Sequence, residues 1–265
     1  MTADSKPLKG KHILITRGGE QGVQFCSWVA NAGGVPHMVQ LIDFRPHEDP
    51  NAQMYMKSIK EYEWIIFTSK NGVNYFFQHM REHMNEFARV LPDIRFAAVG
   101  EKTRAELEKR NVQSHFMPNI YTAEDFAREF FEKGLTGERV LIPKGNLAGK
   151  TIAESFRSRN LRADEWIVYD TFYPSEDEGM LITLLQEDRL DMAVFASPSA
   201  FQHYQSVVDR NGLLGHSQKL YYASIGTVTK KKMEKAGYQV DVCPDTFTMD
   251  EMFAEIRRFY DGRQQ

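Results

Sequence analysis

Short apolar runs alternate along the chain with longer stretches that mix apolar and polar residues at helical spacing. The apolar runs lie at 13–16, 64–67, 96–99, 140–142, 192–195 and 222–225. Runs this short and this apolar are typical of strands buried on both faces, as in parallel sheets. Amphipathic stretches with the length of helices follow them, for example at 21–32, 72–84 and 102–110. The alternation predicts an α/β fold in which parallel sheets are flanked by helices.

The two halves of the chain resemble each other at an offset of about 127 residues. The clearest matches, 126 residues apart, pair Gly100, Thr103, Pro118, Tyr121 and Thr122 with Gly226, Thr229, Pro244, Phe247 and Thr248. Residues 13–18 likewise correspond to 140–145, and 67–70 to 195–198. A repeat this long that occurs only twice indicates duplicated domains rather than a solenoid. We therefore expect two similar lobes with one cleft, connected by extended hinge segments near 41–46 and 166–174.

Composition and charge restrict the partners of the protein. A formal net charge of −3 over 265 residues provides no basic field for nucleic acid or for an anionic membrane. No run reaches the roughly 20 apolar residues of a membrane span, and the polar start of the chain shows no export signal. Cys26 and Cys243 have neither redox nor metal-binding spacing. These features predict a cytoplasmic protein without a metal centre.

The residues that directly follow the predicted strands are candidates for ligand binding. At this edge of a parallel sheet, helix N-termini present free N–H groups and a positive dipole to anions. The candidates are Arg17, Thr68, Ser69, Lys70, Gly100, Thr103, Lys144, Ser197, Ser199, Gly226, Thr227 and Thr229. Taken singly, the serines and threonines are explained by helix capping and the glycines by tight strand-to-helix turns. Their recurrence in both halves favours a site for a polyanionic ligand.

Common catalytic signatures are absent from the sequence. It contains neither a P-loop nor a G-x-S-x-G elbow, and the turn at 18–22 departs from the dinucleotide-binding fingerprint. Tyr169, in the second hinge segment, is a candidate proton donor, because tyrosine hydroxyls are ordinarily protonated at neutral pH. A packed tyrosine whose hydroxyl only satisfies a hydrogen bond is the alternative.

An ordered set of short motifs resembles the uroporphyrinogen-III synthase family. In family order they are Leu14-Ile15-Thr16-Arg17, Ile66-Phe67-Thr68-Ser69, Ala98-Val99-Gly100 with Thr103, Pro118 with Thr122, Val168-Tyr169-Asp170-Thr171, Phe195-Ala196-Ser197-Pro198-Ser199, and Ile225-Gly226 with Thr229. No single motif is specific, whereas the ordered set is. Two positions depart from the family pattern, with Ala196 where Thr or Ser is common and Gly18 where Pro is frequent.

The resemblance implies a fold and a reaction. The fold would be two α/β lobes, 1–40 with 173–265 and 47–165, joined by a two-stranded β-ladder at 41–46 and 166–172. The reaction would be the loss of water from hydroxymethylbilane, a linear tetrapyrrole polycarboxylate, and its cyclisation to uroporphyrinogen III with inversion of ring D. The resemblance implies that this lyase reaction belongs to tetrapyrrole biosynthesis, in which the product leads to heme, siroheme or cobalamin, an alternative that the sequence leaves open, and that it requires no metal or cofactor.

The resemblance also implies roles for individual residues. Tyr169 matches the family's most often proposed acid. The polar positions thought to contact the tetrapyrrole correspond to Thr103, Thr229, Ser69 and Ser197. We add three cations for the substrate carboxylates, for which ordinary surface roles are an equally good explanation: Arg17, Lys70 and Lys144. The predicted binding set is completed by Thr68, Ser199, Thr227, Gly100 and Gly226. The expected partner is the small-molecule substrate, handed over transiently by hydroxymethylbilane synthase to a monomer.

Two other classes of protein are alternatives at this point. One is a binding or regulatory protein that keeps the two-lobed tetrapyrrole scaffold without turnover. The other is a two-lobed sugar-binding module of the periplasmic type, against which the absence of an export signal argues.

Overall fold

The computed structural model describes residues 6–83 and 91–263, and the chain divides into two compact units. The first unit combines Met1–Asp43 with Phe172–Gln265, and the second consists of Phe44–Thr171. The chain therefore passes from one unit to the other twice. None of the described helices combines the length and the apolar character that crossing a membrane requires.

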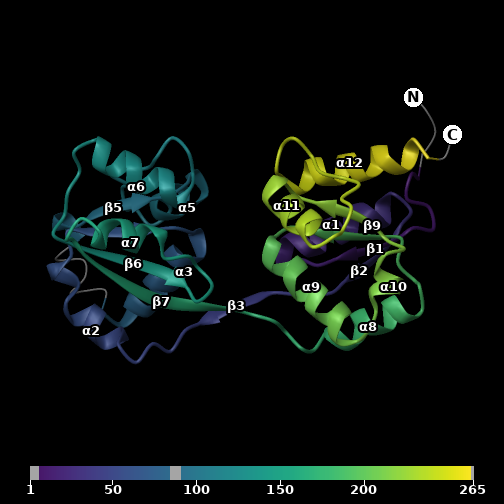
Figure 1. Cartoon of the computed structure of the whole chain (residues 1–265), viewed down its shortest axis with the longest axis horizontal. Helices are drawn as coiled ribbons and strands as arrows, with labels where there is room; N and C mark the ends of the chain where they lie inside the picture. The colour runs from purple at the N-terminus through teal and green to yellow at the C-terminus, as the bar shows by residue number, and fades with distance from the viewer. Residues whose placement is uncertain (1–5, 84–90, 264–265) are drawn as a thin grey trace. The chain divides into compact units, whose positions relative to one another are not determined.

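The first unit is built on a parallel sheet of four strands in the order β2-β1-β8-β9 (Figure 1). The strands are β1 (His12–Ile15), β2 (Val35–Met38), β8 (Met192–Phe195) and β9 (Tyr221–Ser224). Successive side chains enter opposite cores, so Ile13 and Ile15 lie on one face of the sheet and Leu14 on the other.

Helices cover both faces of this sheet (Figure 1). On one face the helices are α1 (Gly19–Asn31) and α12 (Met249–Asp261). On the other face they are α8 (Glu178–Gln186), α9 (Pro198–Arg210) and α11 (Thr227–Lys235), with the short α10 (Leu214–Ser217) beside α8 and α9. The strands are thus shielded from solvent on both sides, as their apolar sequences predict.

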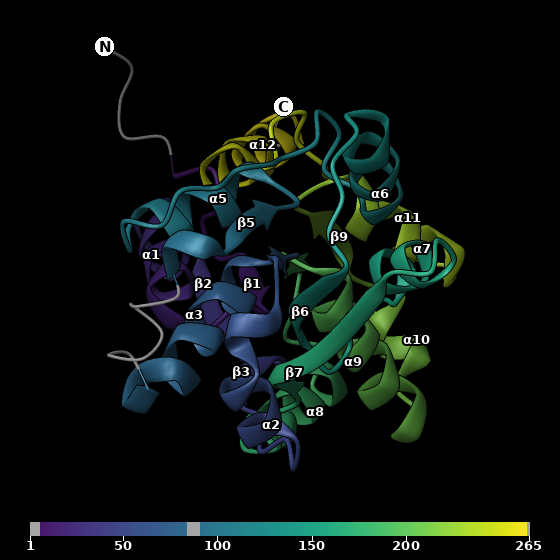
Figure 2. The same ribbon diagram turned by 90° about the vertical axis from the view of Figure 1, so that its left-hand side faces the viewer.

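The second unit is built on a sheet of five strands in the order β3-β7-β6-β4-β5. Figure 2 shows the neighbouring strands β6 and β7 of this sheet. The strands are β3 (Asp43–Pro46), β4 (Trp64–Phe67), β5 (Arg95–Ala98), β6 (Arg139–Gly145) and β7 (Arg162–Phe172), and the last four run parallel. One face packs on α6 (Ala123–Glu132) and α7 (Thr151–Arg157), and the other on α2 (Ala52–Lys57), α3 (Lys70–His79) and α5 (Glu101–Glu108). Short 3-10 turns lie at η1 (Ile59–Glu61), η2 (Met80–His83) and η3 (Leu91–Asp93).

The predicted fold class, parallel sheets flanked by helices, is confirmed. Strands β4 and β8 have the predicted bounds, and most other elements differ from the prediction by one or two residues. The helix predicted at 72–84 begins earlier, at Lys70, and ends at His79, where η2 continues the chain to His83. Met84 lies outside the described residues.

The two sheets match strand by strand according to the sequence repeat. The order β2-β1-β8-β9 corresponds to β7-β6-β4-β5, and one isolated bridge extends each sheet, Ala223 with Val242 and Ala97 with Phe116. Along the chain, however, β1 and β2 precede β8 and β9, whereas β6 and β7 follow β4 and β5. Each half of the sequence therefore contributes its first β-α-β segment to the sheet of the other half.

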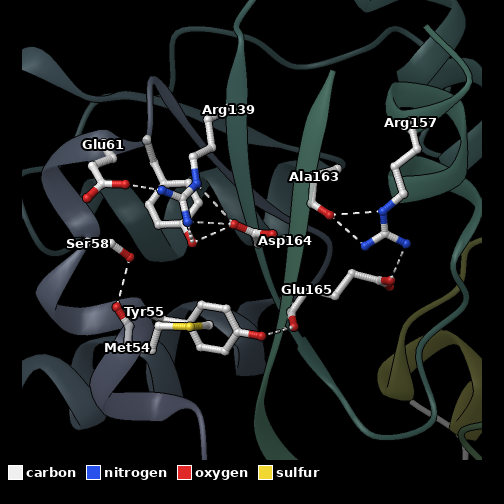
Figure 3. Close-up of polar contacts among 10 residues, drawn as sticks. Met54, Tyr55, Ser58, Glu61, Arg139, Arg157, Ala163, Asp164 and Glu165 are labelled. Atoms are coloured by element: carbon white, nitrogen blue, oxygen red, sulfur yellow. Dashed lines mark hydrogen bonds and ion pairs between the residues drawn. The ribbon is translucent and has the colours of Figure 1, made fainter. Parts of the chain in front are cut away.

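The predicted hinge segments form β3 and the carboxyl-terminal part of β7, which are neighbouring strands of the second sheet. Polar contacts fix the other end of β7 (Figure 3). Asp164 accepts hydrogen bonds from the Tyr62 hydroxyl at 2.8 Å and from Arg139 at 3.1 Å. Burial and the Asp164 carboxylate raise the pKa of Tyr62, so this hydroxyl remains a donor. β7 therefore pairs with β6 from Arg162 to Tyr169, and side-chain hydrogen bonds also hold its first residues in the second unit.

Thr122 and Thr248 cap α6 and α12 at equivalent positions, where each Oγ1 accepts a hydrogen bond from a backbone N–H, of Asp125 at 3.0 Å and of Glu251 at 3.3 Å. We predict that Thr122→Ala and Thr248→Ala each lower the free energy of unfolding by about 1 kcal/mol, because that N–H loses its partner. Urea denaturation measures the effect. Thr136→Ala, which changes an exposed threonine, is the control and should leave the midpoint unchanged. Equal midpoints for all variants would contradict the prediction.

Candidate functional site

Tyr169 lies near the carboxyl end of β7 with its ring packed on the α3 side of the second sheet. The ring stacks on Tyr75 with the centroids 5.4 Å apart and meets Phe44 edge-on at 5.8 Å. Only 8% of the residue is exposed, so packing fixes the direction of its hydroxyl. That hydroxyl lies 3.3 Å from the Oγ of Ser69, which follows β4. The fold thus brings together two predicted site residues that are distant in sequence.

The position of the Tyr169 ring depends on a glycine at the end of β6. A Cβ atom on Gly145 would lie 2.5 Å from Cζ of Tyr169 and 2.8 Å from its hydroxyl oxygen. Any other residue at position 145 would therefore displace the ring. The sequence shows this glycine, but the ring that requires it comes from a neighbouring strand and is visible only in the structure.

The first unit has a similar arrangement with a different side chain. A Cβ atom on Gly18, which corresponds to Gly145 in the repeat, would lie 2.1 Å from Oε1 of Gln40. Gln40 thus covers the glycine of the first unit as Tyr169 covers that of the second. An amide is no acid at neutral pH, so of these two positions only that of Tyr169 offers a proton.

Ser69 and Ser197 are the N-caps of α3 and α9. Their Oγ atoms accept hydrogen bonds from the backbone N–H groups of Gly72 at 3.0 Å and Ala200 at 3.1 Å. The capping explanation is therefore correct for both residues. Each hydroxyl also carries its own proton, which capping does not use. In Ser69 this proton can be shared with the Tyr169 hydroxyl, which lies 3.3 Å away.

Thr103 and Thr229 lie in the first turns of α5 and α11, after the N-cap residues Gly100 and Gly226. Only 5% and 3% of the two threonines are exposed. Within residues 6–83 and 91–263, neither side-chain hydroxyl makes a hydrogen bond. Among the described residues, the fully buried side-chain atoms that lack a hydrogen-bond partner do not include either hydroxyl oxygen, so both oxygens stay accessible although the residues are mostly buried. This equivalent pair can therefore offer hydroxyls to a bound ligand.

Arg17 provides an available positive charge at the end of β1. Its side chain is half-buried, and burial lowers the pKa of its guanidinium. No carboxylate of the described part of the chain pairs with it. Because a guanidinium remains protonated at neutral pH, this group is suited to binding an anion. Lys70, at the first position of α3, is exposed.

Lys144 is engaged inside the second unit. Its side chain is 7% exposed, and its Nζ donates to Oε1 of Glu165 at 2.6 Å and to the carbonyl oxygen of Gly149 at 2.7 Å. The other carboxylate oxygen of Glu165 accepts from Arg157 at 3.1 Å. The expected role of Lys144 as a cation for the substrate does not fit these contacts. The sequence did not reveal Glu165, because the two residues meet across neighbouring strands.

The other predicted residues also lie at these carboxyl edges. Thr68 and Ser199 are half-buried beside Ser69 and Ser197, and Thr227 is exposed at the start of α11. As to metals, the described residues contain no group of three His, Cys, Asp or Glu side chains that could hold an ion.

Comparison with known families and proteins extends this description. Residues 27–254 match the family model described as uroporphyrinogen-III synthase HemD. The chain belongs to the uroporphyrinogen-III synthase family. Its members take part in tetrapyrrole biosynthesis, so the motifs that suggested the resemblance identified the family correctly.

Individual relatives extend over most of the chain. A uroporphyrinogen-III synthase from Chlorobaculum parvum is 29% identical over 238 residues, covering 89% of this chain and 94% of that protein. A porphyrin biosynthesis protein HemD from Ruminiclostridium josui is 29% identical over 95% of this chain, which spans 49% of that protein.

Solved structures of this family share the fold. A mutant uroporphyrinogen III synthase from the extremely thermophilic bacterium Thermus thermophilus superposes with a TM-score of 0.75, covering 96% of this chain and 100% of that one at 13% identity. The enzyme from Helicobacter pylori gives a TM-score of 0.59 at 13% identity, with coverage of 92% and 97%.

We predict that Lys144→Met lowers the free energy of unfolding by about 3 kcal/mol, because it leaves the mostly buried Glu165 carboxylate with only the exposed Arg157 as its ionic partner. The double variant Lys144→Met with Glu165→Met should recover most of this loss, since no buried charge then lacks its partner. Chemical denaturation of the two variants and of the unchanged protein provides the comparison. An unchanged stability in Lys144→Met would mean that the ammonium is not held internally.

Proposed function

We propose that this protein is an active uroporphyrinogen-III synthase, a lyase that converts hydroxymethylbilane to uroporphyrinogen III without a cofactor. We also propose that it acts as a cytoplasmic monomer supplied by hydroxymethylbilane synthase. The observation that carries the catalytic proposal is the Tyr169 hydroxyl held 3.3 Å from Ser69 at the carboxyl edge of the second sheet. The membership of the chain in the family supports it independently.

Tyr169 is the proposed general acid. Its proton passes to the substrate hydroxyl as the carbon–oxygen bond breaks and water leaves, while the adjacent pyrrole nitrogen supplies the electron pair. The substituted carbon of ring D then attacks the methylene carbon and forms a spiro intermediate, which rearranges and closes with ring D inverted. Closure releases one proton from a ring carbon, and this proton restores the Tyr169 hydroxyl. The sum is substrate converted to product plus water.

Binding of the linear substrate in one conformation is the second part of the proposal. The carboxylates are held by Arg17, by exposed cations such as Lys70, and by the hydroxyls of Thr103 and Thr229, which make no hydrogen bond within residues 6–83 and 91–263. Orientation of reacting groups can supply roughly 7 to 11 kcal/mol in favourable cases. Such positioning directs the attack to the hindered carbon, which unassisted cyclisation avoids.

A coupled assay tests the proposed activity. Hydroxymethylbilane is generated in situ with and without this protein, and the oxidised type I and type III uroporphyrins are separated by chromatography. We expect an excess of type III only when the protein is present. Type I alone, from folded protein, would contradict turnover and leave a tetrapyrrole-binding or regulatory protein on the same scaffold, which ligand titration would then examine.

Replacing the proposed acid should slow the reaction. We predict that Tyr169→Phe lowers turnover by about 100-fold or more, the usual contribution of a general acid, while KM changes little. The matched control is Tyr173→Phe, which removes another tyrosine hydroxyl four residues along the chain. Steady-state rates and circular dichroism on both variants separate a chemical effect from unfolding. Full turnover in Tyr169→Phe would remove this residue from the mechanism.

A further inference from the structure

We infer that the half-exposed rings of Tyr121 and Phe247 are stacking platforms for pyrrole rings of the tetrapyrrole, one in each unit. This inference rests on the proposed function and names two further binding residues for it. The platforms are defined as the ring of Tyr121 on Gly100 and the ring of Phe247 on Gly226.

Each ring lies against the backbone of a glycine at the carboxyl edge of its sheet. A Cβ atom on Gly100 would lie 3.4 Å from Cγ of Tyr121, and one on Gly226 would lie 2.9 Å from Cγ of Phe247. The two residues nevertheless remain 55% and 49% exposed. Each aromatic residue is therefore supported by a glycine backbone and keeps about half of its surface open to a ligand.

Both repeats have an aromatic residue at this position, and packing within the folded protein does not account for it. Tyr121 and Phe247 directly precede the N-caps of α6 and α12, where an apolar residue usually packs against the fourth helical residue. Those residues, Phe126 and Met252, are fully buried, whereas the preceding rings stay half open. Among the described residues, neither ring packs against another aromatic ring.

The residue before each aromatic ring differs in polarity between the two repeats. Ile120, which precedes Tyr121, is 54% exposed, and its counterpart before Phe247 is the polar Thr246. The two loops therefore do not share exposed apolar residues in general. A flat ring over a glycine is common to both.

Pyrrole rings suit these platforms. They are flat and rich in π-electrons, so they stack on an aromatic side chain as aromatic side chains stack on one another. Thr103 and Thr229, three residues after the glycines, carry side-chain hydroxyls that make no hydrogen bond among the described residues. Such a hydroxyl can donate to a carboxylate of the same pyrrole or accept from its N–H.

Leucine substitutions test whether a ligand stacks on these rings or whether the rings only pack against the glycines. Tyr121→Leu and Phe247→Leu keep apolar bulk over the glycine but remove the flat ring. We expect each to raise KM, and the Kd of the stable product analogue uroporphyrin III, by roughly 3- to 10-fold, with little change in thermal unfolding. Tyr121→Phe and Phe247→Tyr, which preserve a ring, should raise KM and Kd less than the leucine variants do, and Ile120→Ala, which changes an exposed neighbour outside the platforms, should behave as the unchanged protein.

The outcomes distinguish this inference from the proposed function. Leucine variants with unchanged KM and Kd overturn the platforms, even if they unfold at a lower temperature, and leave the proposed function intact. Ring-dependent binding of uroporphyrin III by a protein that forms no type III product supports the platforms and contradicts the proposed function. A protein that neither turns over hydroxymethylbilane nor binds uroporphyrin III overturns both.

Discussion

Helices cover both faces of each parallel sheet, and this burial governs where chemistry is possible in the molecule. Backbone polar groups in such a sheet are satisfied by neighbouring strands, so polar side chains meet solvent mainly where strands end. Thr16, which follows β1, is still inside the sheet. Its buried hydroxyl donates a hydrogen bond to the Val194 carbonyl at 2.7 Å and is not available to a ligand. One residue further on, Arg17 has no such internal partner among the described residues.

The repeat supplies two copies of one framework, and the chemistry depends on where the copies differ. The caps at Thr122 and Thr248 are the same device in each unit. The side chain over the glycine at the end of the first repeat strand is an amide in one unit and a phenol in the other. This single difference, Gln40 in one unit and Tyr169 in the other, gives only the second unit an acidic hydroxyl at this place, although the two sheets have the same strand order.

The sequence predicted the fold well, because buried parallel strands carry a nearly continuous apolar signal and the repeat shows how many units to expect. It also indicated the strand ends that carry Ser69 and Tyr169, although their contact depends on the register of β6 and β7. What it could not predict were pairings between strands. Lys144 looked like a ligand-binding cation because its partner Glu165 is 21 residues away in sequence. The platform rings were visible as repeated residues, but their exposure became known only from the structure.

The exchange of β-α-β segments between the two sequence halves affects how the chain folds during synthesis. β1 and β2 leave the ribosome well before their sheet partners β8 and β9, which begin at Met192 and Tyr221. At about 5 to 20 residues per second, the opening segment waits many seconds with its apolar edge unpaired. The second unit, continuous from Phe44 to Thr171, is complete earlier. During synthesis, the chain therefore carries one complete unit while β1 and β2 still lack their sheet partners.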